Sequence, residues 1–252
     1  MKIGILITAR LKSTRLPKKV LREIKGRPML SHLLDRMKRS QRASSVTIIT
    51  SPLDEDQPLV QQAQIDGVDA FCGDPDDVLK RMRDCAVSRQ LDLVVSCTAD
   101  NPFVDPVRMD QLIDYHIQNE HGFSRMYGVP WGTFCYTLSR SALERACEIK
   151  DEVDTEVWGG YFTETGLFRW GEMAVEDPAV HWPDLRLTVD YPEDFEMVSR
   201  IFDELYEPGK VFTLEEIVAL CRRCPDIVAI NANASQAIGK PIKVKTNSES
   251  KS

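Results

Sequence analysis

The fold is decided by Ile3-Gly4-Ile5-Leu6-Ile7 and by the segment that follows, Thr8-Ala9-Arg10-Leu11-Lys12-Ser13-Thr14-Arg15-Leu16-Pro17-Lys18-Lys19. A short apolar run of this kind predicts a buried strand. The first 39 residues hold twelve lysines and arginines but two acids, in a chain whose net charge is −7. Backbone N–H groups, a hydroxyl and several cations after a strand favour a polyphosphate site. The alternative is a solvated basic loop.

Composition narrows the class of protein. The chain has 252 residues, of which 42% are hydrophobic and 28% charged, so it is long enough for one large α/β domain or two small ones. The negative net charge argues against a nucleic-acid partner, which needs a broad basic surface. No apolar run reaches the roughly 20 residues of a membrane span, and the N-terminus has no signal-peptide pattern. We therefore expect a cytoplasmic protein without a membrane partner.

The seven cysteines are scattered and odd in number, which favours reduced thiols and no cysteine nucleophile. Cys221 and Cys224 form a lone C-x-x-C pair, and without further ligands we interpret them as structural or surface thiols. The histidines, including His116 and His121, have no metal-ligand spacing.

Short apolar runs alternate with helical periodicity along most of the chain. We expect strands over 3–8, 46–50, 68–72, 91–98 and 185–189, and an antiparallel one over 167–175. We expect helices over 28–39, 59–65, 77–89, 106–119, 141–149, 153–162 and 214–221, and another that ends at 206. The region 122–138 should form strands and a substrate loop. This alternation predicts an α/β fold, a mostly parallel twisted sheet flanked by helices. Residues 1–234 should form one domain and 235–252 a flexible polar tail.

Two aspartates follow predicted strands. Asp100 comes after 93–98, and Asp190 comes directly after 185–189. Ligands of open α/β sheets bind at the carboxyl ends of the strands, where two carboxylates beside a polyphosphate would suit Mg²⁺. A turn or a helix N-cap is the alternative for each aspartate. Asp194 fits a helix start better than a metal site.

Four segments resemble cytidylyltransferases, the family of CMP-3-deoxy-manno-octulosonate and CMP-sialate synthetases and of SpsF-like spore-coat polysaccharide proteins. They are Arg10-Leu11-Lys12-Ser13-Thr14-Arg15-Leu16-Pro17-Lys18-Lys19, Phe71-Cys72-Gly73-Asp74-Pro75-Asp76-Asp77-Val78-Leu79-Lys80-Arg81, Thr98-Ala99-Asp100-Asn101-Pro102 and Arg186-Leu187-Thr188-Val189-Asp190-Tyr191-Pro192-Glu193-Asp194. The first and last are the most specific, and the SpsF-like group is the nearest.

The resemblance implies a single-domain nucleotidyltransferase fold and a Mg²⁺-dependent transfer of CMP from CTP to an acidic acceptor, with release of pyrophosphate. It implies that the triphosphate is held by Ala9, Arg10, Ser13, Arg15 and Lys19, and that Asp100 and Asp190 bind Mg²⁺. Gly73, Asp77 and Thr98 would line the base and ribose. Arg10, Lys19, Asp100 and Asp190 would carry the catalysis. A homodimer is compatible with the resemblance.

The acceptor is left open. Cys72 stands where the family motif has Arg, and Ala99-Asp100-Asn101 replaces Gly-Asp-Cys. The segment 126–134, with three aromatic residues and Arg125 beside it, is either core packing or a sugar-stacking pocket. The alternatives are a sugar phosphate, polyol phosphate or phosphonate acceptor, UTP or GTP as donor, and a non-catalytic nucleotide-binding homologue. An oxidoreductase is disfavoured because no G-x-G-x-x-G follows the first strand.

Overall fold

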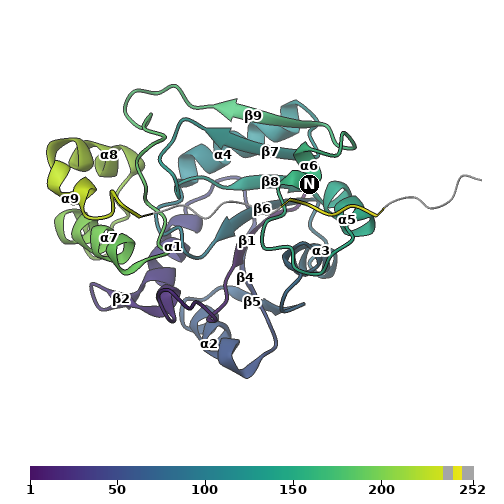
Figure 1. The fold of residues 1–252 in the computed structure, drawn as a ribbon, viewed down its shortest axis with the longest axis horizontal. Helices are drawn as coiled ribbons and strands as arrows, with labels where there is room; N and C mark the ends of the chain where they lie inside the picture. Colours follow the sequence, from purple (N-terminus) through teal and green to yellow (C-terminus); the bar gives the residue numbers. More distant parts are fainter. Residues whose placement is uncertain (235–240, 246–252) are drawn as a thin grey trace, which may run out of the picture.

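The strand predicted at 3–8 lies at the centre of the molecule. The computed structural model describes residues 1–234 and 241–245 (Figure 1). In it β1 (Ile3–Thr8) pairs in parallel with β4 (Ser45–Thr50) on one side and with β6 (Leu93–Thr98) on the other. Ile5, Leu6 and Ile7 are fully buried. A parallel sheet covered on both faces requires such a continuous apolar run.

The main sheet has seven strands in the order β5-β4-β1-β6-β8-β7-β9. The other strands are β5 (Asp69–Cys72), β7 (Phe123–Tyr127), β8 (Tyr136–Ser139) and β9 (Trp170–Ala174). Within this sheet β8 alone runs antiparallel to both of its neighbours. A short hairpin, β2 (Glu23–Ile24) with β3 (Arg27–Pro28), follows the basic loop. The mostly parallel sheet predicted from the alternating pattern is confirmed.

Helices cover both faces of the sheet. They are α1 (Met29–Met37), α2 (Gln57–Ile65), α3 (Val78–Ser88), α4 (Pro106–Gln118), α5 (Arg140–Ile149), α6 (Gly160–Thr163), α7 (Pro192–Leu205), α8 (Leu214–Arg223) and α9 (Pro225–Ala229). Short 3-10 turns occupy Lys19–Leu21 and Asp54–Asp56.

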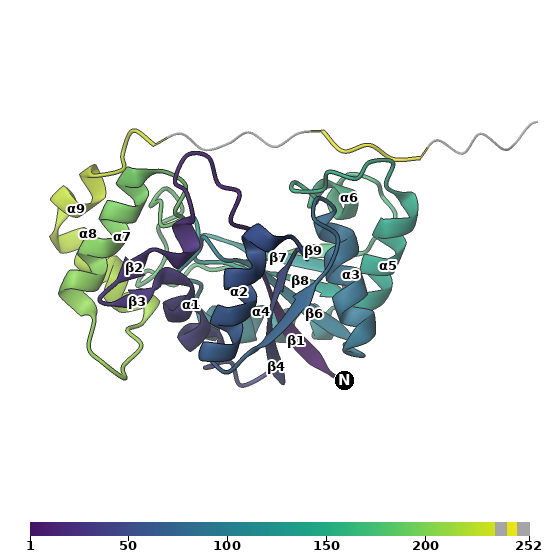
Figure 2. The same cartoon turned by 90° about the horizontal axis from the view of Figure 1, so that it is seen from below.

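Successive residues of the central strand point into two separate cores. Ile5 and Ile7 pack in a cluster with residues of α1, α4, α7 and α8. Leu6, between them, packs in a second cluster with α3 and α5. Side chains alternate across a strand, so one apolar run supplies both faces. Figure 2 shows the two groups of helices on opposite sides of the sheet.

Three predicted elements after residue 150 differ from the structure in extent, in pairing or in orientation. The helix expected over 153–162 is reduced to α6, because Thr155 is buried against the start of α3. Its hydroxyl donates to Asp77 and accepts from the N–H of Leu79, which fixes this segment as a loop. The strand expected over 167–175 is present as β9, but it pairs in parallel with β7. The chain passes through α5 and α6 between β8 and β9, and it reaches the far edge of the sheet beside β7.

The strand expected over 185–189 is an extended segment with one bridge, from Trp131 to Arg186. Trp131 donates its N–H to Leu185, and Leu187 donates to Trp131. The segment crosses the 131 turn instead of joining the sheet, and Gly132 makes this close crossing possible. Gly132 has φ 94°, and a Cβ there would lie 2.5 Å from the nitrogen of Thr188.

Part of the predicted tail contacts the domain. Val244 bridges to Lys150, Asp151 donates its N–H to Lys243, and Lys245 donates to Ile149. The described residues 241–245 therefore line up along the segment after α5. The remainder of the predicted flexible tail, 235–240 and 246–252, lies outside the described residues. No helix in the described ranges combines the length and the apolar character that crossing a bilayer requires.

Candidate active site

A cavity of about 480 Å³ opens where β1 and β6 end. The predicted site residues that line it are Ala9, Arg10, Ser13, Arg15, Lys19, Thr98, Asp100 and Asp190. Segments from opposite ends of the chain thus meet at the carboxyl edge of the sheet, the position at which open α/β sheets bind ligands.

Lys19 lies between the two predicted metal ligands. Its Nζ donates to Asp100 Oδ2 at 2.9 Å, to Asp190 Oδ1 at 2.9 Å and to the carbonyl of Val189 at 2.8 Å. Burial alone would lower the pKa of Lys19, but the two carboxylates raise it. Lys18 is exposed and has φ 53°, so the chain turns sharply just before Lys19. This turn directs the side chain of Lys19 inward.

Asp190 is positioned by Arg186 and by the buried carboxylate of Asp194, which accepts the backbone N–H of Asp190. Arg186 donates to Asp190 Oδ2 at 3.1 Å and to both oxygens of Asp194 at 2.9 Å. Asp194 also accepts the backbone N–H groups of Asp190 and Tyr191, so it caps the start of α7. Burial alone would raise the pKa of Asp190, but Lys19 and Arg186 hold it below its ordinary value. The interpretation of Asp194 as a helix-start residue is confirmed.

The two arginines predicted to hold the triphosphate are bound to other parts of the protein. Arg10 lies 2.5 Å from the buried carboxylate of Asp56, and it also donates to the carbonyl of Pro75. Arg15 donates to the hydroxyl of Tyr191 at 3.0 Å and stacks on that ring at 4.8 Å. Its side chain is 44% exposed, against 13% for Arg10. Arg15 is therefore the freer of the two to turn toward a ligand.

Two of the predicted base and ribose residues do not line the cavity. Asp77 is buried at the N-cap of α3, where it accepts the N–H of Lys80 at 3.0 Å and pairs with Lys150. A Cβ at Gly73 would lie 2.9 Å from Cγ of Arg81, so Gly73 provides packing space. Thr98 does line the cavity, and its hydroxyl accepts from Asn101.

Sequence reasoning missed Arg81 and Trp158, which also line the cavity. Arg81 is 1% exposed and donates to the carbonyls of Asp74 and Pro75, while its Nη1 has no partner in the described part of the chain. Arg81 could have been identified from the sequence, because it is the last residue of the Phe71–Arg81 motif. Trp158 packs edge-on against Tyr136 at 5.2 Å. Nothing in the sequence indicated that Trp158 would line the cavity, because it lay within the helix wrongly expected over 153–162.

The aromatic segment 126–134 lies outside this cavity. Trp131 is 40% exposed and meets Phe134 edge-on at 5.1 Å. Arg125 pairs with Glu172 of β9 and stacks on Trp170. The structure therefore places Arg125 at the outer edge of the sheet rather than in the cavity.

Asp100 and Asp190 could supply some, but not all, of the ligands that a divalent cation needs. Asp100 and Asp190 converge on one point, since both reach the same ammonium at 2.9 Å. Among the described residues, no group of three or more His, Cys, Asp or Glu side chains could hold a metal. Mg²⁺ is commonly held by one or two carboxylates together with substrate phosphates. The pair therefore suits Mg²⁺ that is also bound to a triphosphate.

The cysteines contribute nothing to this cavity. All seven are free, and none is among its lining residues. Burial raises the pKa of Cys85 to about 12 and of Cys221 to about 11. Such thiols are poor nucleophiles at neutral pH.

The fold and this site define a nucleotidyltransferase. A family model described as cytidylyltransferase matches residues 4–157. The chain belongs to the cytidylyltransferase family, as the four motifs implied, and it is an enzyme of the nucleotidyltransferase class.

Individual relatives agree with this assignment. The chain is 28% identical over 232 residues to the spore coat polysaccharide biosynthesis protein SpsF of Bacillus subtilis, covering 89% of this chain and 95% of that protein. It is 30% identical over 115 residues to the 3-deoxy-manno-octulosonate cytidylyltransferase of Geobacter metallireducens, covering 45% and 44%. A solved cytidylyltransferase structure from Leptospira borgpetersenii superposes with a TM-score of 0.83 at 26% identity, covering 95% of this chain and 100% of that one.

Proposed function

We propose that this enzyme transfers CMP from CTP to an acidic sugar and releases pyrophosphate in a Mg²⁺-dependent reaction. The observation that supports this most directly is the Lys19 ammonium between Asp100 and Asp190, at the wall of a 480 Å³ cavity. A cation and two hard carboxylates at one point match the needs of a triphosphate and its metal ion.

The reaction places specific demands on the protein. An oxygen of the acceptor attacks the α-phosphorus of CTP, and the bond from that phosphorus to the bridging oxygen of pyrophosphate breaks. Negative charge then grows on the bridging oxygen. Lys19 would stabilise this charge by exchanging its carboxylate partners for phosphate oxygens. A fixed donor of this kind is worth about 3–4 kcal/mol in the transition state.

The other lining residues would position the triphosphate. The hydroxyl of Ser13 and the guanidinium of Arg15 lie on the same loop as Lys19. Ala9, just beyond β1, lines the cavity at the carboxyl end of the sheet. Its own N–H donates to the carbonyl of Ile49 at 3.1 Å, so Ala9 would form part of the wall beside the phosphates and donate no hydrogen bond to them. Asp100 and Asp190 would hold Mg²⁺, whose charge would neutralise phosphate oxygens and polarise the acceptor oxygen.

The names of the relatives support an acidic sugar as the acceptor. One relative is named for 3-deoxy-manno-octulosonate, and another for spore coat polysaccharide biosynthesis. Trp158 provides an aromatic ring at the cavity wall for stacking on a base or sugar. A sugar phosphate, polyol phosphate or phosphonate acceptor, a different nucleoside triphosphate, and a non-catalytic homologue are the competing functions. A homodimer and a cytoplasmic location remain predictions of the sequence.

A screen for pyrophosphate release tests the proposal. CTP, UTP, GTP and ATP are each combined with Mg²⁺ and a panel of acidic sugars, sugar phosphates, polyol phosphates and phosphonates. We expect release only with CTP and an acidic sugar, and we expect Lys19→Ala to slow it strongly while Lys18→Ala largely retains it. Release with another donor or acceptor class would select the corresponding alternative. No release with any pair, while nucleotide still binds, would favour the non-catalytic homologue.

A further inference from the structure

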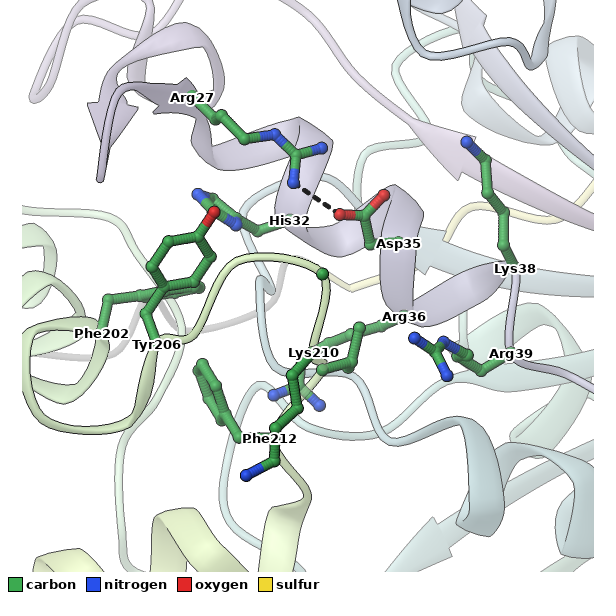
Figure 3. A pocket seen from close by; sticks show the side chains of 12 residues that line it. Arg27, His32, Asp35, Arg36, Lys38, Arg39, Phe202, Tyr206, Lys210 and Phe212 are labelled. Atoms are coloured by element: carbon green, nitrogen blue, oxygen red, sulfur yellow. Dashed lines mark hydrogen bonds and ion pairs between the residues drawn. The ribbon is translucent and has the colours of Figure 1, made fainter.

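A second cavity lies away from the candidate active site. It has a volume of about 270 Å³ and opens between α1, the end of α7 and the loop before α8 (Figure 3). None of its lining residues lines the first cavity. In Figure 2 the loop between α7 and α8 extends to the side opposite the basic loop that carries Lys19. The two cavities are therefore separate sites.

A buried guanidinium forms part of the wall of this cavity. Arg36 is 2% exposed, and its Nη2 has no hydrogen-bond partner in the described part of the chain. Its guanidinium carbon lies 4.8 Å from the ring centre of Phe212 and 5.5 Å from that of Phe103. Aromatic faces attract the cation but leave its N–H donors unsatisfied. A buried donor without an acceptor is costly and calls for an explanation.

Nearby carboxylates do not supply the missing acceptor. Asp105 and Glu216 raise the pKa of Arg36, but burial outweighs them and lowers it to about 10, so the group stays charged at neutral pH. Neither carboxylate pairs with Arg36, and Oδ2 of Asp105 has no partner in the described chain. The one carboxylate in the cavity wall, Asp35, accepts from Arg27 at 2.7 Å.

More cations surround Arg36. Lys38, Arg39 and Lys210 line the same cavity. Lys38 donates to the carbonyl of Asp66, and Lys210 pairs with Glu207 at an exposed position. Arg39 has no hydrogen bond or ion pair from its side chain within the described residues and lies next to Arg36 in Figure 3. The cavity therefore has an excess of positive charge that is suited to an oxyanion.

Aromatic side chains form another part of the cavity wall, and one of them, Phe212, is the ring that Arg36 contacts. Phe202, Tyr206 and Phe212 line the cavity, and His32 packs on Phe202 at 4.4 Å. Burial lowers the pKa of His32, so this ring is neutral near pH 7. These rings could cover the organic part of a ligand whose anionic group faces the cations. At 270 Å³, the cavity suits a molecule smaller than a nucleotide.

We propose that this second cavity binds a small phosphate-bearing anion, with a phosphoryl oxygen as the acceptor for Arg36 and with Arg39 and Lys210 at the rim. The phosphoryl group belongs either to free phosphate or to a small organic monophosphate. Three non-bridging oxygens match several N–H donors at once, and arginine pairs with phosphate through two parallel hydrogen bonds.

The test uses inorganic phosphate and ribose 5-phosphate as probes, with ribose and chloride of equal ionic strength as blanks. We expect a saturable rise of the unfolding midpoint and a calorimetric binding isotherm in the wild-type protein. The double variant Arg39→Ala, Lys210→Ala should weaken binding at least tenfold. Both positions are exposed, so this variant should fold. Arg200→Ala, an exposed residue of α7 outside the cavity, is the matched control and should bind normally.

Phosphate could also enter the candidate active site, and Arg15→Ala distinguishes the two sites. Retention of binding in Arg15→Ala together with its loss in the double variant supports the proposal. The reverse pattern overturns it, and so does the absence of saturable binding to the wild-type protein. Tighter binding of ribose 5-phosphate than of phosphate would identify an organic monophosphate as the ligand class, and equal binding would identify free phosphate.

Discussion

Lys19 and Arg36 both come from the basic N-terminal segment, and the protein treats their charges in opposite ways. Lys19 is neutralised by two carboxylates, each 2.9 Å away. Arg36 is more deeply buried and rests on two aromatic rings without an anion. A ligand at Lys19 must exchange existing partners, whereas one at Arg36 would satisfy vacant donors. One run of positive charge along the sequence thus supplies two chemically different environments.

The largest effect on activity is expected from the two carboxylates that surround Lys19. Asp100→Asn and Asp190→Asn should each remove most of the activity and leave the fold intact, because an amide keeps the shape but loses the charge that would hold Mg²⁺. Turnover at limiting Mg²⁺, with circular dichroism as the check on folding, measures this. A near wild-type rate in either variant would show that the residue is not a metal ligand.

Lys19 and Lys18 form a matched pair within one loop. Lys19→Ala should lower the rate at saturating CTP by a factor of about 10²–10³, the usual cost of one lost transition-state donor. Lys18→Ala should cost far less, because its exposed charge acts on the triphosphate only through screened attraction. Single-turnover rates at moderate salt provide the comparison. A larger loss in Lys18→Ala would mean that the side chains exchange roles when substrate binds.

Methionine substitutions test the two environments through stability. Lys19→Met should lower the free energy of unfolding by about 1–3 kcal/mol, because it leaves two partly exposed carboxylates without their hydrogen-bonding cation. Arg36→Met should stay within about 1 kcal/mol of wild type, because removing unsatisfied donors offsets the lost contact with the rings. Urea unfolding of both variants measures the difference. A marked loss in Arg36→Met would point to a structural partner for that guanidinium instead of a vacant one.

Nucleotide binding should give a smaller effect. CTP with Mg²⁺ should raise the unfolding midpoint by several degrees, because a ligand that binds only the folded state stabilises it by mass action. ATP with Mg²⁺ should raise it much less. Thermal denaturation at matched concentrations measures both shifts, and Arg200→Ala serves as a control for charge. Equal shifts for CTP and ATP would contradict selection of the cytosine base.

The smallest expected effect concerns the thiols. Cys72 is exposed, and its pKa is raised by burial of part of the side chain and by Asp56. Labelling it with one equivalent of a maleimide should leave turnover nearly unchanged, because no cysteine lines the cavity. Mass spectrometry identifies the labelled position. Rapid inactivation that an acceptor prevents would instead indicate a thiol near the acceptor.

The sequence predicted those parts of the molecule that obey local rules. The apolar run at 3–7 forms the predicted buried strand, and the helix expected over 77–89 forms as α3. Asp77 is the N-cap of that helix, although the sequence had placed it at the base and ribose. The position of Asp190 depends on a contact between segments that are far apart in the sequence. Its segment is extended because it crosses the Trp131 turn, and no periodicity records that crossing. Arg36 had no signal of its own, since a charge on an amphipathic helix normally faces solvent.

The ion pair between Lys19 and Asp190 also determines the pH range over which these two groups titrate. The raised pKa of Lys19 means that its stabilising contribution is complete below the unfolded value of about 10.4, and is lost as pH rises through the folded value. The lowered pKa of Asp190 means that its contribution is complete above about 3.9, and is lost as pH falls through the folded value. Both groups therefore keep one charge state between about pH 4 and pH 10. A slope in the rate profile within that window would report the ionisation of the substrates or of another residue, rather than that of Lys19 or Asp190.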